Sequence, residues 1–79
     1  MKARVTVTLK PSILDPQGKA IEGALRSLLI AGVTGVRQGK VFDVELDAND
    51  KNLARRTLDE ACERLLANPI VENYTIEIA

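Results

Sequence analysis

Residues 10–25 read KPSILDPQGKAIEGAL, and this stretch marks a change from strand to helix. Pro11 lacks the N–H group that a sheet ladder needs, so we expect the preceding strand to end there. Asp15 followed by Pro16 is typical of a helix start, because aspartate caps free N–H groups and proline fits the first helical position. The stretch therefore predicts a rigid loop, followed by a helix that begins at Pro16.

The hydrophobic pattern has a different period on either side of this connection. Residues 2–10 alternate between apolar and polar side chains, which indicates a half-buried strand. After Pro16 the apolar side chains recur with the spacing of one helix face, and Gly32 is the expected C-terminal stop. The predicted face consists of Ile21, Ala24, Leu25, Leu28 and Leu29.

A second set of elements follows along the chain. Residues 33–47 predict either a pair of strands or one long bent strand, with a bulge or tight turn near Gln38–Gly39. A second helix is expected to begin at Asn49 or Asp50 and to end at Asn68–Pro69, because the residue before a proline avoids helical geometry. The predicted apolar stripe of this helix consists of Leu53, Leu58, Ala61, Cys62, Leu65 and Leu66.

Residues 70–79 alternate again and complete the order of elements. Strand, helix, strand or hairpin, helix and strand together predict the α+β class. We expect a ferredoxin-like βαββαβ sandwich, in which two helices lie on one face of an antiparallel sheet. With 79 residues and no linker, the chain is expected to form a single domain over residues 1–79.

Composition excludes several classes of partner. The eleven basic and eleven acidic residues cancel, and one Tyr, one Phe and no Trp leave little on which bases could stack. Nucleic-acid binding is therefore not expected. No apolar run is long enough to span a membrane, and residues 1–10 lack the apolar core of a signal peptide. We expect a cytoplasmic protein.

The chain offers little for catalysis. It has no histidine, which is the commonest general base near neutral pH. Its one cysteine, Cys62, lies in a predicted apolar stripe, where a thiol acts as a small inert hydrophobe. No metal-ligand cluster or phosphate-cradling motif is present, and the loop after the first strand lacks the arginine that acylphosphatases place there. No catalytic, cofactor-binding or metal-binding residue is assigned, and the residues favour an interaction module.

Three features of the loops stay open at this point. Ile13 and Leu14 put two large apolar side chains into a rigid connection, where they either fold back over the core or contact a partner. Gly18 lowers helix propensity by about 1 kcal/mol relative to alanine, which suggests a close approach of its backbone to another group. Arg37 and Lys40 flank a glycine-containing turn that could bind a small anion.

Three segments carry a resemblance to a known family. They are VTLKPSILDPQGKAIEGAL at residues 7–25, VRQGK at 36–40 and LLANPIVENY at 65–74. In these segments, which follow one another in the expected order over nearly the whole chain, the sequence resembles the PurS family. PurS is the small subunit of phosphoribosylformylglycinamidine (FGAM) synthase in purine biosynthesis.

The resemblance implies a non-catalytic role. PurS-like chains form homodimers or larger assemblies and hold the synthetase PurL and the glutaminase PurQ together, which supports the transfer of ammonia. ATP, Mg²⁺ and glutamine are then used by the complex, and none is bound by this chain. The candidate partner-contact residues are Ile13, Leu14, Asp15, Pro16, Gln17, Gly18, Arg37, Gly39 and Lys40.

Two other classes of function are kept beside the assembly subunit. A ferredoxin-like regulatory module could bind a small anionic ligand at the basic turn around Gly39. An enzyme acting without partners is the weakest reading, since the usual catalytic side chains are missing.

Overall fold

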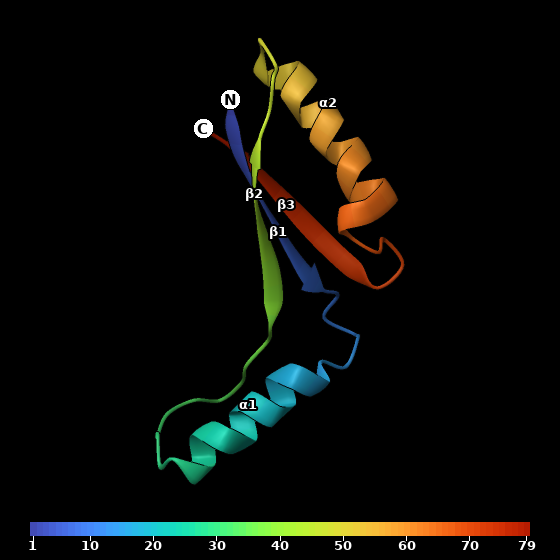
Figure 1. The fold of residues 1–79 in the computed structure, drawn as a ribbon. Helices are drawn as coiled ribbons and strands as arrows, with labels where there is room; N and C mark the ends of the chain where they lie inside the picture. The colour runs from blue at the N-terminus through green and yellow to red at the C-terminus, as the bar shows by residue number, and fades with distance from the viewer.

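The computed structural model describes residues 1–79 and contains three strands and two α-helices (Figure 1). The strands form one sheet in the order β2-β1-β3, with both pairings antiparallel. The α+β class and the predicted order of elements are thus confirmed. The elements are β1 (Lys2–Leu9), α1 (Pro16–Ser27), β2 (Gly39–Glu45), α2 (Lys51–Ala61), the π-helical turn η1 (Cys62–Leu66) and β3 (Glu72–Ile78).

The hydrophobic core lies between the sheet and α2. Val5 and Val7 of the central strand are fully buried, and their neighbours along β1 point to the opposite face, as the alternating sequence predicts. Leu58 and Cys62 contribute the facing side chains from α2 and η1. Across the sheet, Phe42 and Ile76 lie opposite Val5 on β2 and β3 and pack against the same cluster.

The second helix begins where the sequence indicates, but its apolar stripe is shorter than predicted. The side chain of Asp50 accepts a hydrogen bond from the Leu53 N–H at 2.8 Å and caps α2. Leu65, predicted to share the face of Leu58, is 82% exposed. The wider π-helical turn at Cys62–Leu66 changes the spacing of side chains, so a residue seven positions after Leu58 no longer faces the sheet.

Only α2 covers the sheet, and α1 extends away from it. Figure 1 shows α1 beyond the end of the sheet at which β1 finishes. The Cα radius of gyration is 15.9 Å, whereas a compact chain of this length would have about 12 Å. The placement of two helices over one face is therefore not reached within a single chain. Two hydrogen bonds hold α1 in this position. The Val36 N–H donates to the carboxylate of Glu22 within α1, and the Gln38 N–H donates to the carboxylate of Asp15 at its start.

The chain after α1 also differs from prediction. The helix ends at Ser27, five residues before Gly32, because the Leu29 and Ile30 N–H groups bond back to the Arg26 and Leu25 carbonyls at 3.0 and 3.1 Å. Leu29 takes a left-handed φ of 60°, an uncommon conformation for leucine. Residues 33–38 form no strand; of the two alternatives for residues 33–47, the pair of strands is not formed, and the single strand β2 is shorter than predicted.

Candidate functional site

The buried carboxylate of Asp15 joins the start of α1 to the start of β2. It is 4% exposed; Oδ1 accepts the Gly18 N–H at 2.9 Å, and Oδ2 accepts the Gln38 N–H at 2.6 Å. These bonds, that of Gln38 first, hold the pKa of Asp15 below its usual value, because both favour the ionised form. Asp15 thus caps α1, as predicted, and also holds the segment before β2 against the start of this helix.

A second carboxylate, Glu22, repeats this arrangement about two turns further along α1. Oε1 of Glu22 accepts the Val36 N–H at 2.7 Å, and Oε2 lies 3.4 Å from the Lys19 ammonium. The bond from Val36 is the main reason that the pKa of Glu22 lies below its usual value. Together, Asp15 and Glu22 satisfy two backbone N–H groups that a hairpin would have used, which explains why residues 33–38 are not a strand.

Gly18 and Gly39 allow the backbone to come close to neighbouring oxygen atoms. A Cβ atom on Gly18 would lie 2.5 Å from Oδ2 of Asp15 and 2.5 Å from the Val36 carbonyl oxygen. A Cβ atom on Gly39 would lie 2.7 Å from the Val7 carbonyl oxygen. The close approach expected at Gly18 is therefore present, and the neighbouring group belongs to this chain.

Arg37 holds the loop that follows β1. Its guanidinium donates hydrogen bonds to the carbonyl oxygens of Lys10 and Ile13 at 3.0 and 2.9 Å. Nearby, the amide of Gln38 donates to Oε1 of Gln17 at 2.9 Å. The predicted contact residues in 13–18 therefore lie close to those in 37–40, and Arg37 binds the carbonyl oxygen of Ile13.

The segment 65–74 meets the same region, which the residue patterns by themselves did not predict. The Lys10 N–H donates to the Val71 carbonyl at 2.8 Å, which continues the β1–β3 pairing beyond the strands. The Glu72 carboxylate accepts the Asn68 N–H at 2.6 Å and lies 3.6 Å from the Lys40 ammonium. The available signal was the resemblance, which included this segment as one of its three motifs.

Exposure separates the candidate contact residues into two groups. Asp15 and Gly18 are buried, and Ile13 is half-buried against the chain. Leu14 is 69% exposed, so it does not fold back over the core. Pro16, Gln17, Arg37, Gly39 and Lys40 are also exposed.

A hollow of about 330 Å³ lies between the start of α1 and the neighbouring end of the sheet. Its walls include the amides of Gln17 and Gln38 and the ion pair between Lys40 and Glu72. Every buried side-chain nitrogen or oxygen has a hydrogen-bond partner within the chain.

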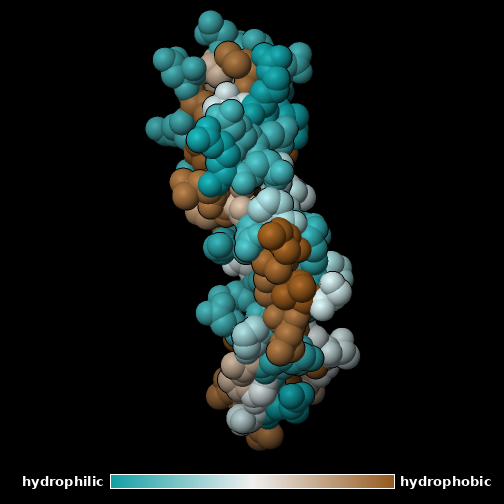
Figure 2. All heavy atoms as spheres, turned by 90° about the vertical axis from the view of Figure 1, so that its right-hand side faces the viewer, coloured by the Kyte–Doolittle hydropathy of each residue, from teal (hydrophilic) through white to brown (hydrophobic).

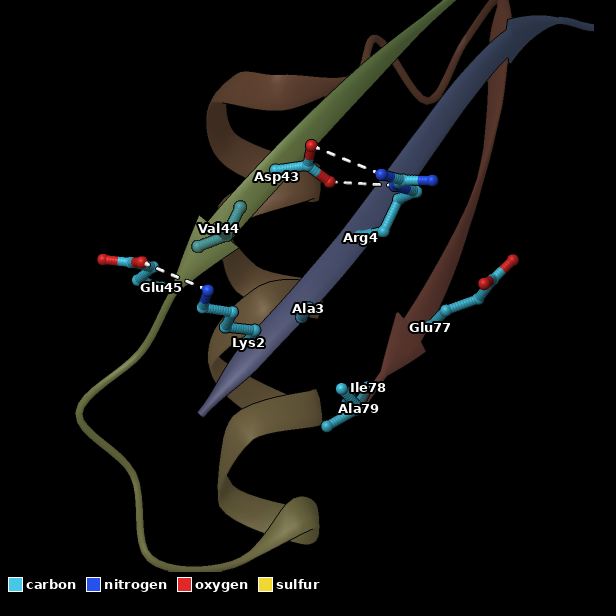
Figure 3. A pocket seen from close by; sticks show the side chains of 9 residues that line it. All are labelled: Lys2, Ala3, Arg4, Asp43, Val44, Glu45, Glu77, Ile78 and Ala79. Carbon is cyan, nitrogen blue, oxygen red and sulfur yellow. Dashed lines mark hydrogen bonds and ion pairs between the residues drawn. The ribbon is translucent and has the colours of Figure 1, made fainter.

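A larger hollow of about 790 Å³ lies at the opposite end of the sheet. There the Asp43 side chain points toward Arg4 on the neighbouring strand, with Oδ1 2.8 Å from the Arg4 Nε (Figure 3). The hydrogen bond from Arg4, and then its charge, lower the pKa of Asp43, and the reciprocal interactions raise the pKa of Arg4. These charges compensate each other, and the arrangement is a salt bridge on a polar sheet face.

The single thiol of the chain lies in surroundings that disfavour its ionisation. Burial, and then the charges of Asp59 and Glu63, raise the pKa of the Cys62 thiol, which disfavours the nucleophilic thiolate. No group of three or more His, Cys, Asp or Glu side chains is arranged to hold a metal ion. Neither helix has the length and hydrophobicity needed to cross a membrane. The site is a network of hydrogen bonds and ion pairs within the chain, and several side chains around it are exposed.

The low pKa of Glu22 gives a testable pH dependence. Because its folded-state pKa lies below the ordinary value of 4.5, the stabilisation is complete above that value and is lost as the pH falls through the folded-state pKa. Glu22→Gln keeps an acceptor for the Val36 N–H but cannot titrate. We expect the thermal midpoint of the wild type to fall more steeply than that of Glu22→Gln between about pH 5 and pH 3.

Calorimetry at matched protein concentration measures both curves. Glu45→Gln is the control, since the Glu45 side chain is 83% exposed and its ion pair with Lys2 spans 4.0 Å. Parallel curves for the wild type and Glu22→Gln would contradict the role given to this carboxylate.

The fold and the site define a small α+β interaction subunit. The chain belongs to the PurS family: the family model described as phosphoribosylformylglycinamidine (FGAM) synthase matches residues 2–79. It is 47% identical to the FGAM synthase subunit PurS of Synechocystis sp., over 95% of this chain and 75% of that protein.

Solved structures agree with this assignment. The chain matches the PurS structure of Bacillus subtilis with a TM-score of 0.86 and 42% identity, over 96% of this chain and 94% of that one. It also matches a chain in the structure of PurLQS from Thermotoga maritima, with a TM-score of 0.89 and 36% identity, over 96% and 93% of the two chains. The predicted family is therefore confirmed.

Proposed function

We propose that this chain is a non-catalytic assembly subunit of FGAM synthase, which holds a PurL synthetase and a PurQ glutaminase together so that ammonia passes between them. The observation that carries the proposal is the match, along nearly its whole length, to a chain of PurLQS. The contacts of the site support the proposal, because residues 15–17 and Gln38 bind one another and form one ordered surface. ATP, Mg²⁺ and glutamine would be used by the partners, in the cytoplasm.

Self-association is part of this proposal. The accessible surface is 5844 Å², about 1,100 Å² more than a compact monomer of 8.6 kDa exposes. One partner in a stable complex commonly buries about 800 Å². The excess is explained by the extended α1 and the segment after it, whose exposed apolar side chains are Ile21, Leu28, Leu29, Ile30 and Val33.

Six of the nine candidate contact residues are proposed to act in one of two ways. Leu14, Pro16, Gln17 and Lys40 are accessible and could contact a partner directly. The buried Asp15 and the tightly packed Gly18 would act by fixing the loop before association, so that less conformational entropy is lost on binding.

The contacts of the basic turn around Gly39 support the anion-binding alternative less well than the assembly role. Lys40 is paired with Glu72, and Arg37 donates to two carbonyl oxygens of its own chain. An anion would have to compete with these contacts for both cations.

The assembly role is tested with the complete enzyme. Purified PurL and PurQ subunits are assayed for FGAM formation with glutamine or with ammonium as nitrogen source, in the presence and absence of this chain. We expect glutamine-dependent activity to require the chain and ammonium-dependent activity to persist without it. Equal glutamine-dependent rates in both reactions would refute the proposal.

Self-association is tested by Leu28→Asp. Leu28 is 68% exposed at the end of α1, so the change should preserve the fold, whereas a charge at an apolar interface is strongly unfavourable. We expect the dissociation constant of the self-complex to rise at least about 100-fold in analytical ultracentrifugation. Ser27→Asp adds the same charge one residue earlier and is the control. Unchanged association of Leu28→Asp would remove α1 from the interface.

A further inference from the structure

The end of α1 has the geometry of a helix stop that normally contains glycine. The Leu29 N–H donates to the Arg26 carbonyl and the Ile30 N–H to the Leu25 carbonyl, at 3.0 and 3.1 Å. These two bonds form a Schellman motif, in which the residue after the C-cap takes a left-handed conformation and is usually glycine. Here that residue is Leu29, with a φ of 60°, and Leu28 is the C-cap.

Leucine is an unfavourable residue in this conformation. A left-handed backbone brings the Cβ atom of an L-residue close to the following carbonyl oxygen, and glycine avoids this contact because it has no Cβ atom. Gly32, three residues later, also has a positive φ, of 90°, and there the sequence has the expected residue. Folding of the isolated chain would therefore favour glycine or asparagine over Leu29.

No contact within the chain compensates for the conformation of Leu29. Its side chain is 90% exposed, more than any other large apolar side chain. A leucine side chain stabilises a fold through the apolar surface that it buries, and this one buries almost none. The backbone conformation and the hydrophobic effect thus both disfavour leucine at this position in a single copy of the chain.

The surroundings of Leu29 are apolar and uncharged. Residues 27–35 read SLLIAGVTG and contain no ionisable side chain. Leu28 and Ile30 are also exposed, and Figure 2 shows hydrophobic atoms at the lower end of the molecule, where Figure 1 places the end of α1. Such a surface can be buried against another protein without removing a charge from water.

A second copy of the chain is the occupant that charge and surface area favour. Eleven basic and eleven acidic residues cancel, so two copies do not repel each other through net charge. The accessible surface exceeds that of a compact monomer by about 1,100 Å², and one partner in a stable complex commonly buries about 800 Å². The extended α1 and the segment after it, which explain this excess, include Leu29.

We propose that Leu29 is an anchor of self-association, whose side chain is buried against a second copy of the chain. This contact compensates for the unfavourable backbone conformation of the isolated chain. The inference rests on the proposed function and deepens it, because it names a residue that serves association rather than folding. Folding of one copy and association of two copies therefore make opposite demands on this position.

Leu29→Gly and Leu29→Asn test the role of the side chain, since both residues accept a left-handed backbone and neither is large and apolar. Sedimentation equilibrium of the full chain measures the dissociation constant of the self-complex. We expect each variant to raise it about 100-fold, because both copies lose the burial of a leucine side chain. Leu29→Met is the matched control: it keeps a large apolar side chain on the same backbone and should associate like the wild type.

Thermal midpoints separate folding from association. They are measured by circular dichroism over a concentration series that spans the wild-type dissociation constant. Association stabilises the folded chain, so the wild-type midpoint rises with concentration. At the lowest concentration we expect Leu29→Gly to melt about 4 °C above the wild type, because the backbone strain is relieved. At the highest concentration we expect the wild type to melt above Leu29→Gly.

Each of the other outcomes overturns the inference. If Leu29→Gly associates as tightly as the wild type, the leucine is not an anchor. If Leu29→Gly melts below the wild type at the lowest concentration, the leucine stabilises the single chain. If Leu29→Met loses association as fully as Leu29→Asn, burial of an apolar side chain is not the cause.

The glutamine-dependent assay with PurL and PurQ distinguishes this inference from the proposed function. If Leu29→Gly self-associates normally but no longer supports glutamine-dependent FGAM formation, the side chain contacts a different subunit and the inference is wrong. If the wild type supports that activity without associating with itself, the inference fails while the assembly role stands. If the wild type does not support it, the proposed function fails, whatever the dissociation constant of the self-complex.

Discussion

Gly18→Ala is expected to destabilise the chain by about 2–3 kcal/mol, although alanine is the better helix former by about 1 kcal/mol. The added Cβ atom would lie 2.5 Å from Oδ2 of Asp15 and 2.5 Å from the Val36 carbonyl oxygen. Neither atom can move freely, because Oδ2 accepts the Gln38 N–H and the Val36 N–H is bound by Glu22. The substitution therefore separates α1 from the segment before β2.

Gly23→Ala in the same helix gives the opposite expectation. No heavy atom outside its local backbone lies within 4 Å of the Cβ position, so the gain in helix propensity of about 0.5–1 kcal/mol is not opposed by a clash. Urea unfolding of both variants and the wild type, at one protein concentration, compares their free energies of unfolding. Equal stabilisation by both alanines would show that the contacts around Gly18 are not rigid.

Leu58→Ala is expected to cost about 2–5 kcal/mol, a large fraction of the 5–15 kcal/mol typical of natural domains. Leu58 is 1% exposed and is among the largest fully buried side chains. It packs in a core cluster of only six buried residues, so few neighbours are available to fill the space left by the truncation. We expect Leu58→Ala to be largely unfolded at 37 °C.

Leu53→Ala tests whether burial explains this effect. It removes the same atoms from the same helix at a position that is 41% exposed, and we expect a loss below about 1.5 kcal/mol. Circular dichroism melting of the two variants at equal concentration measures the difference. A loss from Leu53→Ala as large as that from Leu58→Ala would place the core elsewhere.

Local patterns predicted most of the elements. The alternation in β1 and β3, the Asp15–Pro16 start of α1 and the start of α2 depend on residues close together in sequence, and all are present. The end of α1 was predicted wrongly, because an unusual left-handed Leu29 replaces the glycine expected in a C-terminal cap.

The candidate site was predicted in parts. Gly18 indicated a close backbone approach, and the structure identifies the approaching group as the Val36 carbonyl. Nothing in the pattern of residues 33–38 showed that Gln38 and Val36 would bond to Asp15 and Glu22, since those carboxylates lie 23 and 14 residues earlier. Such contacts depend on the path of the whole chain.

The sequence by itself determined the family and the order of strands and helices, since these follow from residue identity and from spacing within an element. Only the tertiary structure decided that α1 extends beyond the sheet and that residues 7–25, 36–40 and 65–74 converge at one end of it. The physical reason is that isolated N–H groups and carboxylates can be satisfied by many partners, and the folded path of the backbone selects which of them meet.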